Sequence, residues 1–238
     1  MIPEGLSKVS EPALISFRLK HRSDWTLWTR MTNAYFISAA WYPIIDYANV
    51  EVINVKWLDK GVNIHEYFTR LSKRGLIYDV GLVKKITGSI YLVGFMGPYK
   101  NTVRERLILN NIPYFKSSIH DGFQDWLILA PLNKVSDFKE SLRSIGRLIN
   151  FKIQHITSIR DVARVIAGNN NLLDYIKLAL TNNELKALRN AWELGYFNSR
   201  NRATLSEVSA ALNKDKSTVD RQIKESIRKI IYYIMSIM

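Results

Sequence analysis

The sequence predicts an α+β fold in which an N-terminal region of two ferredoxin-like (βαββαβ) repeats precedes an all-α helix-turn-helix domain. Short β-rich runs alternate with helical stretches up to about residue 157, and beyond that point almost every segment has the periodicity of a helix. Within the first part, the runs follow the order β-α-β-β-α-β twice, which is the order of a ferredoxin-like sandwich. A chain of 238 residues, 47% of them hydrophobic, suffices for one or two folded domains.

The N-terminal elements are recognised by their apolar spacing and by one clear turn. Asp121-Gly122 separates two apolar runs, and this pair favours the positive φ angles of a tight hairpin. The clearest helix repeats an apolar residue every three or four positions, at Val135, Phe138, Leu142, Ile145 and Ile149. The expected strands are residues 13–20, 35–42, 50–57, 77–85, 89–95, 114–119, 123–129 and 151–156. The expected helices are residues 24–32, 63–74, 101–111 and 134–148.

The change of periodicity sets the expected domain boundaries. The connector after the β-rich part has one apolar helix face, which ends at the Gly-Asn-Asn-Asn stretch of residues 168–171. Residues 172–179 fit either a helix or a strand. The expected parts are an α+β domain at 1–157 with repeats at 12–87 and 88–157, a connector at 158–179, and a helix-turn-helix domain at 180–238.

Three short amphipathic helices are expected after residue 180. Their apolar stripes are Leu185, Leu188 and Trp192, then Leu205, Val208 and Leu212, and finally Val219, Ile223 and Ile227. Asn213-Lys214-Asp215 separates the second helix from the third, since Asn tolerates a turn conformation and Asp215 can cap the following helix. Such a short turn between two helices defines the helix-turn-helix arrangement, whose second helix enters the major groove of DNA.

The charge balance favours a polyanionic partner. Lysine and arginine number 34 against 21 aspartate and glutamate, which gives a net charge of +13. Nucleic acid and an anionic membrane surface are the partner classes that such a charge attracts. No apolar run approaches the ~18 residues of a membrane span, and residues 1–10 lack the apolar core of a signal peptide. We therefore expect a cytoplasmic, nucleoid-associated protein without membrane contact.

The residue types argue against an enzyme. Cysteine is absent, which excludes disulfides, thiolate nucleophiles, zinc–thiolate sites and iron–sulfur clusters. The four histidines show no metal-ligand spacing, and the sequence contains neither a phosphate-binding loop nor a visible nucleophile–base pair. We expect no catalytic residue, no metal site and no cofactor.

Candidate DNA-binding residues lie on the third helix and just before the second. The outward positions of the third helix combine hydrogen-bonding groups suited to base edges with cations suited to phosphates. The residues before the second helix lie at its positive end. Asp220 fits a groove only if it accepts a hydrogen bond from a cytosine amine or pairs with a neighbouring cation. The candidate set is Arg200, Arg202, Thr204, Lys216, Ser217, Thr218, Arg221 and Lys224.

This C-terminal segment resembles a known family. The residues that carry the resemblance are Leu180-Thr181, Leu188, Ala191, Gly195-Tyr196-Phe197, Thr204-Leu205 and Lys216-Ser217-Thr218-Val219. Together they look like the C-terminal helix-turn-helix of archaeal transcription regulators related to the bacterio-opsin activator. One departure is Arg200, where the family tends to have Pro, although the positive charge of the loop is kept. The resemblance implies a sequence-specific transcription regulator with an N-terminal sensory region, and residues 121–156 are more weakly similar to the domain that often precedes this motif.

A small-molecule effector and a second subunit are further expectations. The side chains of Trp25, Trp28, Trp41 and Trp57 predict either a ligand pocket or an ordinary core. A ligand bound there would change the spacing of two DNA-reading helices. The apolar stretch 230–238 exceeds what one short domain buries, so it either pairs with a second subunit or folds back on the N-terminal region. We expect a homodimer on promoter DNA.

An RNA-binding protein is the alternative function. A ferredoxin-like sheet with aromatic residues is also the platform of RNA-recognition domains, but residues 89–95 lack the basic-Gly-aromatic pattern of its central strand. An RNA binder should prefer single strands, whereas a transcription regulator should prefer duplex DNA. A pure protein–protein adaptor would show no salt-sensitive binding to nucleic acid.

Overall fold

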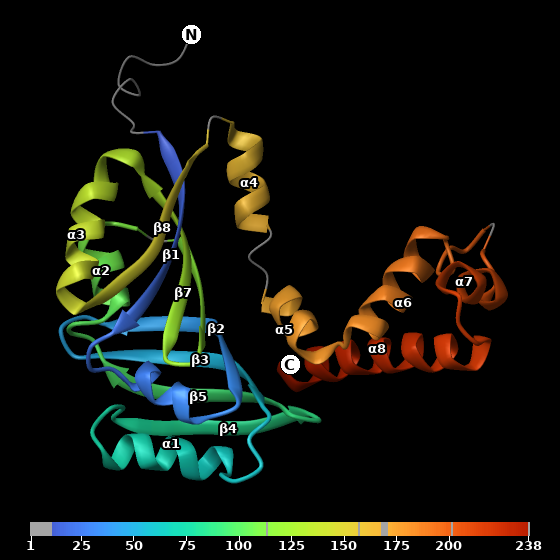
Figure 1. The fold of residues 1–238 in the computed structure, drawn as a ribbon, viewed down its shortest axis with the longest axis horizontal. Helices are drawn as coiled ribbons and strands as arrows, with labels where there is room; N and C mark the ends of the chain where they lie inside the picture. The colour runs from blue at the N-terminus through green and yellow to red at the C-terminus, as the bar shows by residue number, and fades with distance from the viewer. Residues whose placement is uncertain (1–10, 113, 157, 168–170, 201, 238) are drawn as a thin grey trace. The chain divides into compact units, whose positions relative to one another are not determined.

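The computed structural model describes residues 11–112, 114–156, 158–167, 171–200 and 202–237 (Figure 1). The chain divides into two compact units. Residues 1–84 and 91–170 belong to the first unit, and residues 85–90 and 171–238 belong to the second. The fold is α+β with an antiparallel sheet, and helices make up the C-terminal part, as the sequence predicts.

The strands and helices expected from the sequence are present. The strands are β1 (Pro12–His21), β2 (Ala34–Ile44), β3 (Ala48–Trp57), β4 (Asp79–Thr87), β5 (Ile90–Pro98), β6 (Tyr114–His120), β7 (Phe123–Pro131) and β8 (Gly146–His155). Their helices are η2 (Trp25–Met31), α1 (Ile64–Lys73), α2 (Val103–Leu109), η3 (Leu132–Lys134), α3 (Val135–Ile145) and α4 (Ile159–Ala167). The largest difference is that α3 ends at Ile145 and β8 starts at Gly146 rather than at residue 151, so Ile149 lies in a strand and not on the expected helix. A Cβ at Gly146 would lie 2.7 Å from the carbonyl oxygen of Lys20, so glycine allows α3 to lead directly into a strand against β1.

All eight strands form one sheet in the order β4-β5-β3-β2-β6-β7-β1-β8. The expectation of two separate ferredoxin-like repeats is therefore not confirmed. β1 pairs antiparallel with β7 and β8 of the second expected repeat, while β5 lies between β3 and β4. The two halves of the sheet meet where β2 pairs with β6, at Phe36 and Ile119. Periodicity predicts where strands occur but not their partners, because an alternating strand can pair with any strand whose apolar face matches.

The expected hairpin turn joins β6 to β7. His120 pairs with Phe123, so the loop contains only Asp121 and Gly122. Their φ angles are 51° and 77°, and the Asp-Gly pair supplies the two residue types that tolerate this left-handed backbone.

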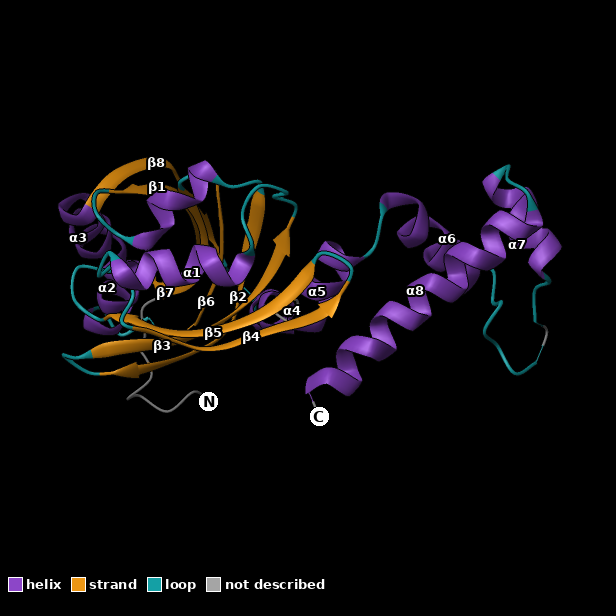
Figure 2. Cartoon of the chain, turned by 90° about the horizontal axis from the view of Figure 1, so that it is seen from below, coloured by secondary structure: helices purple, strands orange, loops and turns teal. Residues whose placement is uncertain are grey.

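Hydrophobic cores formed by described residues support the first unit. Burial of a side chain such as Phe138 or Leu142 stabilises the fold by roughly 1.5–3 kcal/mol. The core around β1, β7, α2 and α3 includes Ile15, Phe17, Leu107, Trp126, Ile128, Phe138 and Leu142. The core around α1 and strands β2, β3 and β5 includes Trp25, Phe36, Ile53, Val55, Phe68, Leu71 and Phe95. Figure 2 shows the pronounced curvature of the sheet between these regions.

The described part of the second unit is mainly helical. Its helices are α5 (Asn171–Ala179), α6 (Asn182–Glu193), α7 (Leu205–Leu212) and α8 (Lys216–Ile237). Residues 172–179, which the sequence left open, are therefore helical. Among the described residues, no helix has the length and apolarity needed to span a membrane.

Candidate nucleic-acid interface

A small core holds α6, α7 and α8 together. The buried side chains are Ala187 and Ala191 of α6, Val208 of α7, and Val219 and Ile223 of α8. The expected stripe on α6 was wrong in two of its three members, since the exposed fractions of Leu185 and Trp192 are 37% and 73%. The two alanines allow close approach between α6 and its neighbours, which a leucine or tryptophan at these positions would prevent.

Two capping boxes fix the starts of α6 and α7. The Thr181 hydroxyl accepts a hydrogen bond from the Glu184 backbone at 3.2 Å, and the Glu184 carboxylate accepts from the Thr181 backbone at 2.7 Å. Thr204 and Glu207 repeat this arrangement at α7, with distances of 3.3 Å and 2.6 Å. Each box satisfies two N–H groups that a helix otherwise leaves without partners. These exchanged hydrogen bonds also lower the pKa of Glu207, with the Thr204 backbone as the main cause.

The turn between α7 and α8 has the expected geometry. Asn213 has φ 50° and ψ 50°, a left-handed conformation that ends α7 and that asparagine tolerates better than most residues. The backbone of Val219 donates to the carbonyl oxygen of Asp215 at 3.0 Å, which places Asp215 at the start of α8. The turn thus spans three residues between two helices, as the sequence predicts.

A lysine on α8 links this helix to α6. Lys229 Nζ donates to both carboxylate oxygens of Glu184, at 2.9 Å and 2.8 Å, and to the carbonyl oxygen of Ala179 at 3.1 Å. Burial disfavours the charge of Glu184, but the hydrogen bonds from Lys229 and Thr181 outweigh it and lower the pKa of this carboxyl. Neither residue was predicted from the sequence, although Glu184 three positions after Thr181 is a capping-box pattern.

The outward face of α8 carries most of the candidate DNA-binding residues. Lys216, Ser217, Arg221 and Lys224 are exposed, and Thr218 is half-buried. Exposed residues at positions 217, 221 and 224 recur at helical spacing, opposite the buried Val219. This face therefore presents a hydroxyl and several cations to solvent from the first turns of the helix.

Asp220 is paired with a neighbouring cation. Lys224 Nζ donates to its carboxylate at 2.7 Å, one helical turn away. The side chain of Lys224 is 74% exposed, so this pair contributes little to stability. Pairing with a neighbouring cation is one of the two conditions under which a carboxylate fits a DNA groove.

The remaining candidates lie before α7. Arg200 and Arg202 are exposed, and the guanidinium of Arg202 lies 4.6 Å from the centre of the Tyr196 ring. The Thr204 hydroxyl accepts from the Glu207 backbone and donates to the Glu207 carboxylate at 2.8 Å. Thr204 is therefore engaged in capping, whereas the two arginines present cationic groups at the surface.

A three-residue turn, two capped helices and an exposed cationic helix face define a helix-turn-helix DNA-binding domain. Residues 180–232 match a family model described as an HTH DNA-binding domain, of the bacterio-opsin activator type. The resemblance predicted from the sequence is thereby confirmed for this part of the chain. No curated protein matches the chain. The matched domain supports a DNA-binding transcription regulator.

Three of the four candidate ligand-binding tryptophans meet in one hydrophobic core, and Trp41 is not part of it. Trp25 lines a cavity in the first unit, and Trp28, Trp41 and Trp57 are not among the described residues that line it. Trp25 and Trp57 belong to one hydrophobic core, and Trp28 packs against it. The Trp41 ring lies 5.4 Å from the guanidinium of Arg104, which does line the cavity.

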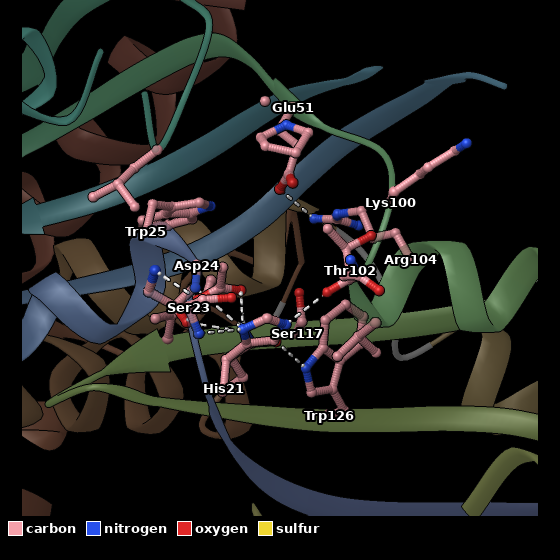
Figure 3. Close-up of a pocket in the computed structure, with 18 of the residues that line it drawn as sticks. His21, Ser23, Asp24, Trp25, Glu51, Lys100, Thr102, Arg104, Ser117 and Trp126 are labelled. Atoms are coloured by element: carbon pink, nitrogen blue, oxygen red, sulfur yellow. Dashed lines mark hydrogen bonds and ion pairs between the residues drawn. The ribbon is translucent and has the colours of Figure 1, made fainter. Parts of the chain in front are cut away.

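The cavity also brings together polar residues that the sequence analysis missed. His21 of β1, Asp24 before η2, Arg104 of α2 and Ser117 of β6 all line it (Figure 3). They come from distant parts of the chain, so no spacing in the sequence relates them. One signal was available, since Arg104 stands three residues before Leu107 and therefore on the apolar face of α2.

Proposed function

We propose that the chain is a sequence-specific transcription regulator that binds promoter DNA as a homodimer and responds to a small-molecule effector in its N-terminal unit. The observation that carries the DNA-binding part is the exposed face of α8, which begins directly after the turn of a matched helix-turn-helix domain. In this arrangement the second helix enters the major groove by its N-terminal residues.

Each candidate residue then has a distinct role. Ser217 and Arg221 face outward on the first turns of α8 and are suited to base edges, where arginine pairs with guanine through two hydrogen bonds. Lys216, Lys224, Arg200 and Arg202 supply cations for phosphates, and Thr218 lies at the edge of the same face. Thr204 acts through its cap, which holds the backbone at the start of α7.

Dimerisation is supported by the last turns of α8. Ile231, Tyr232 and Met235 are 53%, 54% and 65% exposed, although they are large and apolar or aromatic. Tyr233 is different, because its ring stacks on Tyr175 of α5 with 4.0 Å between centroids. One side of the stretch is thus used inside the unit, and the other is available for the same helix of a second subunit, as a two-fold interface requires.

The effector proposal rests on the cavity in the first unit and not on a cluster of tryptophans. A ligand regulates only if it binds two conformations with different affinity. The cavity is lined by β1, β3, β6 and β7 as well as by α2. A ligand there would contact strands from both halves of the sheet, and we propose that its affinity depends on how these halves are arranged.

We further propose that the sheet derives from two ferredoxin-like repeats that exchange their first strands. The half β6-β7-β1-β8 has the strand order of such a repeat, except that β1 occupies the position expected for β5. In the other half, β4-β5-β3-β2, β5 occupies the position expected for β1. The domain boundaries that accompany this proposal are 1–157 and 180–238, with a connector at 158–179 whose helix α5 packs on α8.

Selection of bound fragments from sheared genomic DNA tests the proposed function. The full chain should enrich a few duplex sites, with half-sites about one helical turn apart. Affinity for the recovered sites should fall steeply with salt, because each phosphate contact releases counterions. A preference for single-stranded RNA would favour the alternative RNA-binding function, and binding without salt dependence would favour a protein–protein adaptor.

A further inference from the structure

The cavity in the first unit has a volume of about 190 Å³, far more than the ~10–15 Å³ that one water requires. It lies among β1, the segment before and at the start of η2, β3, the loop between β5 and α2, and β6 and β7. In Figure 3, Trp25 and Trp126 lie on different sides of the labelled lining residues, and Lys100 points away from the other side chains. The lining is therefore partly aromatic and partly polar.

Most polar groups around the cavity already have partners. His21 Nδ1 accepts from the backbone N–H groups of Ser23 and Asp24, both at 3.1 Å. The proton of the neutral ring is then on Nε2, which donates to the carbonyl oxygen of Asn101 at 2.8 Å. Gln124 donates to Asp24 at 2.7 Å and accepts from Trp126 at 2.9 Å. These contacts fix the frame of the cavity without a ligand.

Arg104 and Ser117 each place in the lining a buried donor that has no hydrogen-bond partner among the described residues. Arg104 is 4% exposed and Ser117 is 1% exposed. Arg104 Nη2 donates to Glu51 at 2.5 Å and to Ser38 at 3.2 Å, but Arg104 Nη1 has no hydrogen-bond partner among the described residues. The Ser117 hydroxyl has none among them either. A buried polar group without a partner carries a desolvation penalty that a suitable acceptor would remove.

The position of the guanidinium is rigid. Its central carbon lies 5.4, 5.0 and 5.6 Å from the ring centres of Trp41, Phe115 and Trp126, and Glu51 holds its other nitrogen. A guanidinium fixed in this way donates along a set direction, and carboxylates are the acceptors that best match its charge and planar geometry.

We propose that this cavity binds a small organic acid whose carboxylate accepts hydrogen bonds from Arg104 Nη1 and Ser117 Oγ. Trp25 and Trp126 contact the rest of the ligand. The cavity volume limits the ligand to about the size of an amino acid or a short dicarboxylate. The role of this acid as an effector rests on the proposed function. Its binding to the cavity is measurable without DNA.

The test is calorimetric titration of the full chain with small acids and their neutral amides. The probes are lactate, succinate, 2-oxoglutarate, alanine and phenylalanine. Lactamide, succinamide and the amides of the two amino acids are the neutral-headed counterparts. At least one acid should bind, change the tryptophan fluorescence and raise the melting temperature. Its amide should have none of these three effects. Failure of every acid, or equal binding of acid and amide, would overturn the proposal.

Adjacent serines provide a matched pair of variants. Ser117→Ala removes a buried hydroxyl that has no described partner, so folding should be preserved, and affinity for the acid should fall about tenfold. Ser118→Ala is the control, because Ser118 lies on the opposite face of β6 and its hydroxyl accepts from Tyr35 at 3.3 Å. Unchanged affinity in Ser117→Ala would contradict the assignment.

A second variant addresses the arginine, and DNA binding separates the two proposals. Arg104→Lys keeps the positive charge but removes the planar donor pair, and it should weaken acid binding by at least tenfold. The same preparations are tested on duplex DNA without ligand. In the wild-type chain, DNA binding without binding of any acid would overturn only the ligand site, whereas acid binding without any DNA binding would overturn only the proposed function.

Discussion

At the scale of single residues, the carboxylate of Glu184 joins two helices. It closes the capping box of α6 and accepts two hydrogen bonds from Lys229 of α8. Both side chains are largely shielded, with exposed fractions of 12% for Glu184 and 18% for Lys229. Removal of one partner would leave the other charge poorly solvated.

Glu184 predicts a pH dependence of the helical unit. Burial raises its pKa, but Lys229 and Thr181 lower it further, so the folded pKa lies below its ordinary value of 4.5. The ionised carboxylate therefore stabilises the fold above the unfolded pKa, and this stability is lost as the pH falls through the folded pKa. Glu184→Gln should lower the stability at pH 7 and weaken its decline between about pH 5 and pH 3.

Urea unfolding of the full chain at several pH values, followed by circular dichroism, measures this effect. Glu193→Gln is the matched control, because Glu193 is an exposed carboxylate on the same helix. An unchanged pH profile in Glu184→Gln would show that the contact with Lys229 contributes no net stability.

Residue identity alone predicted part of the site. The exposed positions of Arg221 and Lys216 follow from the periodicity of the helix, and Asn213 was recognised as a turn residue. Leu185 and Trp192 were wrongly predicted to be buried, because Ala187 and Ala191 make the close contact instead. The hydrophobicity of a side chain does not show how closely two helices approach. Arg104 was missed because a buried arginine depends on partners from other elements.

At the scale of elements, α8 combines two surfaces. Its first turns carry the proposed DNA-reading face, and its last turns expose Ile231, Tyr232 and Met235. In the proposed homodimer, this apolar surface would position a second copy of α8 relative to the first. The half-site spacing on DNA then depends on how the two copies of α8 pack.

Charged substitutions on this surface test the dimer. The wild-type chain should sediment at micromolar concentration with twice its mass of 27.6 kDa, and Ile231→Lys combined with Met235→Lys should sediment as a monomer. The pair Met31→Lys and Leu58→Lys is the control, since both residues are exposed in the other unit. A monomeric wild-type chain would contradict the proposal.

The order of elements was predictable and the pairing of strands was not. Alternation identified β1 and β5 as strands, and the Asp-Gly pair identified the hairpin between β6 and β7. The two repeats expected at 12–87 and 88–157 are not confirmed, because β1 pairs with β7 and β8, more than a hundred residues later in the chain. Such long-range pairing depends on matching apolar faces, which local periodicity does not specify.

At the scale of the whole molecule, the net charge of +13 agrees with a nucleic-acid partner but does not select duplex DNA. The preference for duplex DNA is indicated by the helix-turn-helix domain, which the family comparison identifies at residues 180–232. The cavity in the other unit offers a place for chemical control. We propose that the outward face of α8 reads the sequence of duplex DNA.

The affinity ratio between a selected duplex and a random duplex, measured at fixed salt for wild type and Arg221→Ala, tests that claim most directly. Arg221→Ala should lose about 1–3 kcal/mol on the selected site and much less on random DNA, because a base contact specifies while phosphate contacts do not. Lys73→Ala, an exposed lysine on α1, controls for the loss of one charge. An unchanged ratio in Arg221→Ala would contradict the claim that this face reads the sequence.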